Sequence, residues 1–152
     1  MKFKGDIIIT DPCYITKNDD WSKCCYGERM EVLGIHNYIC RNTIYGDWSC
    51  TTFNTNTGES IGKFCADAGM VAVFLLDEVL QYNSDFDYHI KRPRTTTWIK
   101  DFDGDVDFEV IHTEGIYEKD TKWHKKGDKW KDDSVRVVGK GNVNFVGRQT
   151  GF

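Results

Sequence analysis

Three short stretches of the chain place aspartates beside aromatic or small residues where an apolar run stops. The stretches are DPCY after the run DIIIT, YGDW, and ADAG within segment 61–76; their polar and aromatic residues are Asp11, Tyr14, Tyr45, Asp47, Trp48 and Asp67. Loops held by a rigid sheet commonly carry binding residues. If the three stretches converge, the carboxylates accept hydrogen bonds from a small polar ligand, nucleotide-like in character, and the aromatic rings stack against it.

The same aspartates allow other interpretations. Asp11, Asp47 and Asp67 could hold two divalent ions around a phosphate, as in a metal-dependent phosphoester hydrolase, or could form an acid/base pair. Alternatively, each aspartate accepts backbone N–H groups and stabilises its own turn. Ligand binding without catalysis is the preferred prediction, with no catalytic residue, metal or cofactor, because the sequence shows no assembled nucleophile and base.

The cysteines indicate a reducing compartment. All six lie in the first half of the chain, at positions 13, 24, 25, 40, 50 and 65. The N-terminus lacks a signal-peptide pattern, and no Cys-x2-Cys pair indicates zinc. We therefore predict free thiols and a cytoplasmic protein. Cys13 is not expected to be a nucleophile, because Asp11 would raise the pKa of its thiol and no histidine lies nearby in the sequence.

Segment 114–133 mixes lysines and acids around two tryptophans, in EGIYEKDTKWHKKGDKWKDD. It lacks a sustained apolar period, so we expect a long hairpin loop or excursion from a single domain, 1–152. Aromatic rings among lysines are typical of single-stranded nucleic acid binding, but the flanking acids oppose a polyanion. The remaining interpretations are tryptophans that fold back on the domain, or contact with a partner protein through Trp123, Lys125 and Trp130.

Length and composition limit the fold and the partners. A chain of 152 residues with 39% hydrophobic residues is long enough to bury a sizeable core in one domain. The net charge of −4 and a pI near 5.5 argue against general DNA coating, so nucleic acid is not an expected partner. No apolar run approaches the roughly 18 residues of a membrane span. The expected partner is a small polar ligand or a host protein, and nothing indicates the oligomeric state.

Strand-like runs separated by turn signals predict a mainly β fold: one antiparallel, barrel-like or sandwich domain with one or two short helices. The helices are expected in NDDWSKCCYGERM, ending at Tyr26, and in LLDEVLQYN, with Asp77 as N-cap. Gly46-Asp47 is expected to form a hairpin or a sharp corner. Ala68-Gly69 is expected to separate two strands.

Asp103-Gly104 is the strongest hairpin signal in the chain, because this dipeptide favours a two-residue type I′ turn. Such a turn pairs Ile99 with Phe108 and leaves an inward apolar face and a charged outer face. The surrounding acids in DFDGDVDFE are not expected to bind calcium, because a hairpin sends its carboxylates to opposite faces.

The motifs GDIIITDPCYI, TIYGDWSC and FCADAGMVAVFLL, in this order, resemble an uncharacterised family of short phage and bacterial proteins. That family pairs Asp-Pro-Cys-Tyr after a strand with a Tyr-Gly-Asp corner and an Asp-Ala-Gly or Asp-Ser-Gly segment. The resemblance covers residues 5–76. It implies a small accessory protein in the host cytoplasm, without an established reaction, and it does not extend to segment 114–133.

Overall fold

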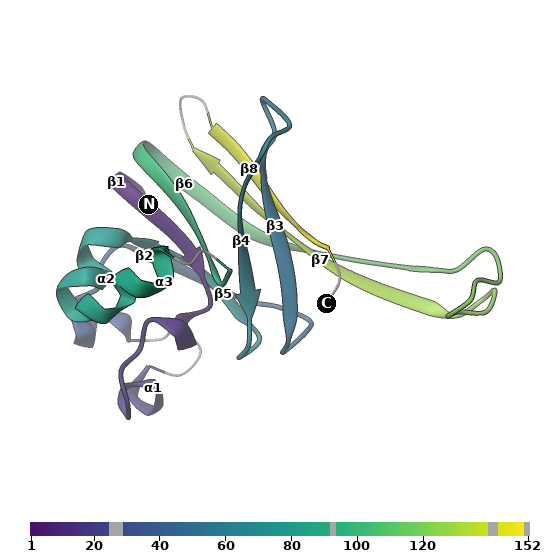
Figure 1. Cartoon of the computed structure of the whole chain (residues 1–152), viewed down its shortest axis with the longest axis horizontal. Helices are drawn as coiled ribbons and strands as arrows, with labels where there is room; N and C mark the ends of the chain where they lie inside the picture. The colour runs from purple at the N-terminus through teal and green to yellow at the C-terminus, as the bar shows by residue number, and fades with distance from the viewer. Residues whose placement is uncertain (25–28, 92–93, 140–142, 151–152) are drawn as a thin grey trace.

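The structure is a computed structural model and describes residues 1–24, 29–91, 94–139 and 143–150. These residues contain one antiparallel sheet in the order β2-β5-β1-β6-β7-β8-β3-β4 (Figure 1). In chain order its strands are β1 (Lys2–Thr10), β2 (Tyr38–Asn42), β3 (Trp48–Asn54), β4 (Ser60–Ala66), β5 (Met70–Leu75), β6 (Thr96–Ile116), β7 (Lys129–Gly139) and β8 (Val143–Gln149). The predicted mainly β, antiparallel fold is confirmed, although the sheet is not closed into a barrel.

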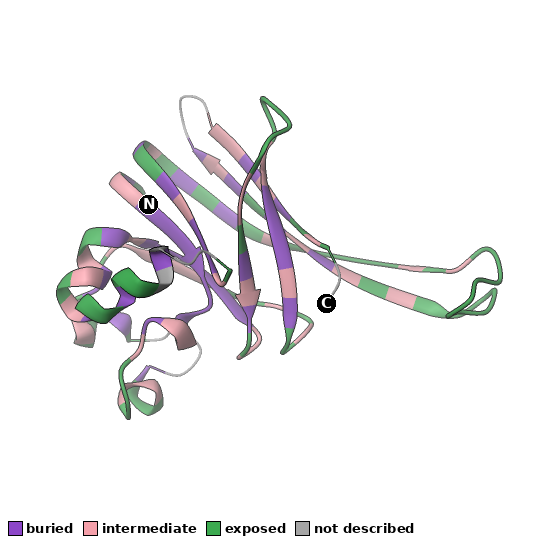
Figure 2. Cartoon of the chain, viewed as in Figure 1, coloured by how far each residue is buried: buried purple, intermediate pink, exposed green. Residues whose placement is uncertain are grey.

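The core lies on both faces of the sheet. In β1, Ile7 and Ile9 belong to one buried cluster, whereas Ile8 points to the opposite face and joins a second cluster. Successive side chains of a strand point to opposite faces, so a strand covered on both sides reads as a continuous apolar run. The second half of β1 is buried, and Figure 2 shows the helices on one side of this part of the sheet.

The described α-helices are α1 (Asp20–Lys23), α2 (Leu76–Tyr82) and α3 (Asp87–Lys91). Helices α2 and α3 contribute Leu76, Val79 and Ile90 to the second cluster, whereas α1 buries none of its residues. Asp77 was predicted to be the N-cap of α2, and this is wrong: the helix begins at Leu76, and Asp77 lies in its first turn. The predicted end of the first helix, at Tyr26 and Gly27, lies outside the described residues. In the described part of the chain, no helix combines the length and apolar character needed to span a membrane.

The predicted hairpin at Asp103-Gly104 is wrong. Strand β6 continues through both residues, and Gly104 pairs with Phe3 of β1. The neighbouring strand therefore supplies the backbone partners that a hairpin would have supplied. The strand is irregular two residues before this dipeptide, where Asp101 has a φ of +53° and donates its N–H to Asp6 Oδ1 at 3.0 Å.

The predicted inward face of this segment is nevertheless right. The inward apolar residues are Ile99, Val106, Phe108 and Val110, all of which pack in the first cluster. In one regular strand Ile99 and Val106, which are seven residues apart, would point to opposite faces. The irregularity at Asp101 shifts the alternation by one residue and so brings them to the same side.

The other two turn signals separate strands that do not pair with each other. After Gly46-Asp47 the chain enters β3, which pairs with β4 and β8, while β2 pairs with β5. The corner at Gly46 is therefore not a hairpin. Ala68-Gly69 separates β4 from β5 as predicted, and the two strands lie in different halves of the sheet.

Strands β6 and β7 extend beyond the rest of the sheet as a two-stranded arm (Figure 1). We define the arm as residues 112–133 and its tip as residues 117–128, between the last paired residues Ile116 and Lys129. The chain segment that the sequence identified as an excursion is thus a long β-hairpin that projects from the body of the molecule.

Candidate functional site

The carboxylate of Asp11 connects two of the three predicted stretches. It is fully buried, and its Oδ1 accepts a hydrogen bond from the N–H of Cys13 at 3.0 Å. Its Oδ2 accepts the N–H groups of Asp67 and Ala68 at 2.9 and 2.8 Å. A buried carboxylate needs such donors, and with three of them Asp11 is stabilised without any ligand.

Tyr14 and Asp67 meet beside this carboxylate, where the Tyr14 hydroxyl donates to Asp67 Oδ2 at 2.5 Å. Burial, followed by this hydrogen bond, raises the pKa of Tyr14 above its ordinary value. Burial and the charge of Asp11 likewise raise the pKa of the Cys13 thiol. At neutral pH this corner therefore contains neither a thiolate nor a phenolate, and it offers no strong nucleophile.

The third stretch adjoins the other two through its backbone. Thr43 donates its N–H to the carbonyl of Gly69 at 2.8 Å, and a Cβ placed on Gly69 would lie 3.9 Å from the Cα of Gly46. The side chains of Asp47 and Trp48, however, lie outside the Asp11 corner. Asp47 is exposed, and Trp48 is only 2% exposed, in the core.

The structure thus brings together Asp11, Tyr14 and Asp67, and places Asp47 and Trp48 elsewhere. Among the described residues, no group of three or more potential metal ligands lies close enough to hold an ion. The convergence of the three turns is real, but the hydrogen bonds that unite them are internal. Their chemistry is that of a structural corner.

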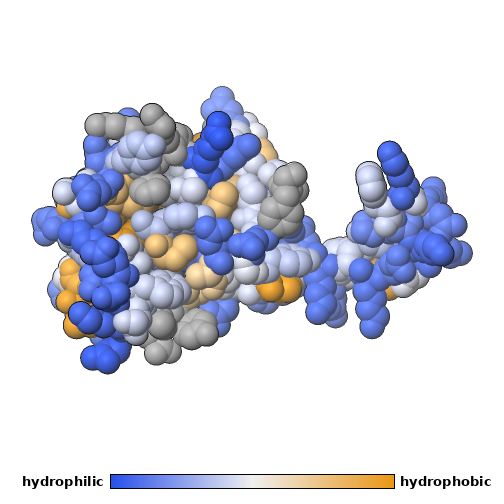
Figure 3. Space-filling view, turned by 60° about the horizontal axis from the view of Figure 1, so that its bottom comes forward, coloured by the Kyte–Doolittle hydropathy of each residue, from blue (hydrophilic) through white to orange (hydrophobic). Residues whose placement is uncertain are grey.

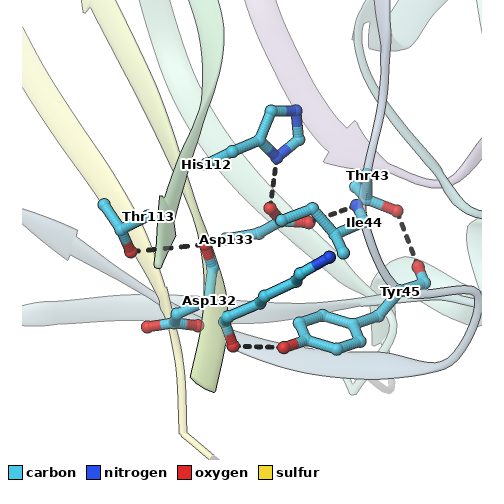
Figure 4. Close-up of polar contacts among 8 residues, drawn as sticks. Thr43, Ile44, Tyr45, His112, Thr113, Asp132 and Asp133 are labelled. Atoms are coloured by element: carbon cyan, nitrogen blue, oxygen red, sulfur yellow. Dashed lines mark hydrogen bonds and ion pairs between the residues drawn. The ribbon is translucent and has the colours of Figure 1, made fainter. Parts of the chain in front are cut away.

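A second buried carboxylate, Asp133, lies at the base of the arm. There the connection between β2 and β3 contacts the arm (Figure 4). Asp133 is 0% exposed; its Oδ1 pairs with His112 Nδ1 at 2.5 Å, and its Oδ2 accepts the N–H of Ile44 at 2.5 Å. Tyr45 adds a third contact, because its hydroxyl donates to the carbonyl of Lys131. We call these contacts the clasp.

The clasp joins the 43–47 connection to both strands of the arm. A carboxylate on the Nδ1 of a histidine resembles the orienting pair of many catalytic sites. Among the described residues, however, no hydroxyl or thiol is hydrogen-bonded to the ring of His112. The geometry fits an anchor for the arm better than an acyl-transfer site. Sequence alone gave no signal for the pair, because its members are far apart and lie in a polar segment.

Asp132 points to the opposite face of β7 and lines an open hollow of about 320 Å³ with Tyr117, Trp130, Lys131 and Gln149. Its Oδ1 is buried, with no hydrogen-bond partner among the described residues. Burial, and to a smaller extent the charge of Asp133, raises the pKa of Asp132. The ionised form of Asp132 is therefore disfavoured in the folded protein.

The tip of the arm has a defined conformation of its own. Tyr117 exchanges backbone hydrogen bonds with Asp128 and Gly127, both at 2.8 Å. The Thr121 hydroxyl accepts the N–H of His124 at 3.0 Å, and the His124 ring stacks on Tyr117 with centroids 4.1 Å apart. These contacts fix the backbone on both sides of residue 123.

The two tryptophans of the arm have different environments. Trp123 is 78% exposed at the tip, so the interpretation that both tryptophans fold back is wrong for this residue. Trp130 lies across the arm on Gly115, where an added Cβ would come within 2.5 Å of the indole ring. Trp130 thus packs on its own hairpin, whereas Trp123 and the exposed Lys125 face solvent.

Comparisons of the chain with protein-family models, with curated proteins and with solved structures found no match. The resemblance in residues 5–76 therefore stays a prediction. The geometry does give its motifs a common physical basis, because Asp11 and Tyr14 of the first motif bond directly to the Asp67 segment of the third.

Proposed function

We propose that this chain is a non-catalytic binding protein that engages a partner protein through the tip of its arm. The observation that carries the proposal is Trp123, 78% exposed on a hydrogen-bonded turn at the far end of a projecting hairpin. Tryptophan is enriched among the residues that dominate binding energies at protein interfaces. A cytoplasmic accessory role, with reduced cysteines, belongs to the same proposal.

The order of the tip favours a recognition role. A binding loop that is already in its bound conformation loses less conformational entropy on association, which improves affinity. In the tip, the N–H groups of Trp123 and His124 both bond to the Thr121 hydroxyl, at 3.3 and 3.0 Å. The indole is therefore presented from a restrained backbone and is not carried on a loose loop.

The other two predicted functions have less support. A polar ligand at Asp11 would have to displace three backbone donors from a buried carboxylate. A two-metal hydrolase would need Asp11, Asp47 and Asp67 around one cavity, and only Asp11 and Asp67 adjoin. The partner-binding proposal gives the projecting arm a role. The ligand-binding and hydrolase alternatives give it none.

Photo-crosslinking from the tip tests this proposal. A benzophenone amino acid replaces Glu118, and cross-linked proteins from an extract of cells that carry the gene are identified by mass spectrometry. The protein captured by the otherwise unchanged chain should be lost with Trp123→Ala. It should be retained with Tyr88→Ala, which removes a 57% exposed aromatic side chain from α3 on the body. Equal capture by both variants would contradict the proposal.

A further inference from the structure

We infer that the surface bound by the tip is an apolar pocket with an acidic rim on a partner protein. This inference rests on the proposed function and specifies the chemistry of the partner. Along the chain the arm has as many lysines as acids. In the structure, however, several of the acids accept hydrogen bonds, whereas the lysines of the tip are exposed.

Most acids of the arm lie against a backbone donor, a histidine or a lysine, whereas Glu118 is exposed and Asp132 Oδ1 has no hydrogen-bond partner among the described residues. Asp120 accepts the N–H of Lys126 at 2.8 Å, and Asp128 accepts the N–H of Lys125 at 2.9 Å. Asp133 is buried in the clasp, and Glu114 lies opposite Lys131 in the strand register. Carboxylates that accept backbone N–H groups have part of their field compensated by those dipoles.

The lysines of the tip face solvent. Lys119, Lys122, Lys125 and Lys126 are exposed, and none of them takes part in an ion pair among the described residues. The ammonium group of Lys122 lies 5.0 Å from the centre of the Trp123 ring. The tip therefore presents an exposed indole with one lysine ammonium beside it and three further exposed lysines within four residues along the chain, on an arm that Figure 3 shows as generally hydrophilic.

The arm separates this surface from the acidic body. The tip has four lysines and three acids, so the rest of the chain carries the whole negative excess behind the net charge of −4. From Val110, the last residue of β6 that packs on the core, to Ile116 the strand rises by roughly 20 Å. Since charges are screened over about 8 Å at physiological salt, the body does not cancel the field of the tip.

The number of anchors selects the class of partner. Trp123 is the exposed indole of the described tip, because Trp130 packs on Gly115. One stacked base contributes only about 1–3 kcal/mol, and nucleic acid binding normally adds a basic groove that the acidic body does not offer. Stable membrane attachment likewise needs more than one weak anchor. One tryptophan in a protein pocket can dominate an interface, and a rim of carboxylates would match the surrounding lysines.

Charge reversal at constant Trp123 tests the inference. The protein captured by cross-linking is titrated against the full chain, against Lys125→Glu/Lys126→Glu, and against Lys63→Glu/Arg148→Glu. The last variant makes the same change in net charge at exposed positions on the body. We expect at least a tenfold loss of affinity for the tip variant and less than a twofold change for the control. Raising the salt from 50 to 300 mM should weaken the unchanged chain by several-fold.

The outcomes separate the two claims. If affinity depends on Trp123 but not on Lys125, Lys126 or salt, the acidic rim is refuted while the proposed function stands. If no captured protein depends on Trp123, the proposed function fails as well. Two further probes are an oligothymidine 20-mer and vesicles with phosphatidylserine. If either probe binds more tightly than the captured protein does, and this binding depends on Trp123, the tip recognises that class of partner and the inference is wrong.

Discussion

At the scale of single residues, two buried carboxylates organise this protein. Asp11 accepts three backbone N–H groups at the corner where β1 ends, and Asp133 joins His112 to Ile44 at the base of the arm. Each aspartate connects segments that are distant in the chain. Their burial and their hydrogen-bond partners are those of structural residues, although a buried aspartate first suggests chemistry.

Asp11→Asn should destabilise the fold by about 2–3 kcal/mol, because an amide leaves at least one of the three buried N–H donors without an acceptor. The free energy of unfolding is measured by urea denaturation. Asp47→Asn is the matched control at an exposed position, expected to change stability by less than about 0.5 kcal/mol. Equal effects would mean that Asp11 is not the hub of the corner.

Asp132→Asn should stabilise the protein at pH 7. Burial raises the pKa of Asp132 in the fold, so the wild-type carboxyl is favourable only while protonated. That contribution is present below the ordinary aspartate pKa of about 3.9 and is lost as the pH rises through the folded value. Asparagine cannot ionise, so urea midpoints of the two proteins should differ at pH 7 and converge at pH 3. A variant that is less stable at pH 7 would contradict the raised pKa.

The sequence allowed Asp11, Tyr14 and Asp67 to converge, and the structure brings these three residues together. Of the interpretations left open for Asp11, the backbone hydrogen bonds are those of a turn-stabilising carboxylate, and ligand binding at this corner stays a prediction. Residue type and position at strand ends were enough to expect convergence. Whether a carboxylate turns toward solvent or toward main-chain N–H groups depends on the path of the other loop, which the local sequence does not specify. His112 and Asp133 were missed altogether, because only the strand register places them opposite each other.

At the scale of elements, the arm must be held straight by local contacts, since an isolated two-stranded hairpin is marginal in water. Three kinds of contact do this. Trp130 covers Gly115, the rings of Tyr117 and His124 stack at the tip, and the clasp fixes the base. A glycine in a strand commonly marks a close approach, and here the approaching group is an indole.

Trp130→Ala should loosen the arm without unfolding the body. Removing this cross-strand contact costs about 1 kcal/mol, so amides of residues 113–116 and 129–132 should exchange with solvent roughly fivefold faster. Hydrogen–deuterium exchange measures this. Trp123→Ala should leave the same amides unchanged, because its ring is solvent-exposed. Similar acceleration in both variants would show that Trp130 has no special role in the hairpin.

For the first half of β6, the sequence predicted the inward face better than the connection. The prediction placed Ile99, Val106 and Phe108 on the inward face, and they lie there because the irregularity at Asp101 shifts the alternation by one residue. The turn at Asp103-Gly104 was wrong, because a local signal cannot take account of β1, which supplies a neighbouring strand along β6. Strand pairing is a non-local property, and turn chemistry is overridden where a better partner is available.

At the scale of the whole molecule, the sheet order joins strands that no short-range pattern connects. β1 lies between β5 and β6, and β8 lies between β7 and β3. This order leaves β6 and β7 free to extend past the body as the arm, so a balanced run of lysines and acids becomes a projecting tip. The polar segment 114–133 predicted an excursion, and the structure shows it as a paired β-hairpin, but the order of the strands that leaves it free to project could not be predicted from local patterns.

The central claim is that the tip is an ordered element that presents Trp123, and backbone ¹⁵N relaxation tests it most directly. The account predicts order parameters for residues 117–128 close to the value of about 0.85 found in rigid backbone, in the range of the core strands. Values below about 0.6 across the tip would show a flexible loop, and they would contradict the account.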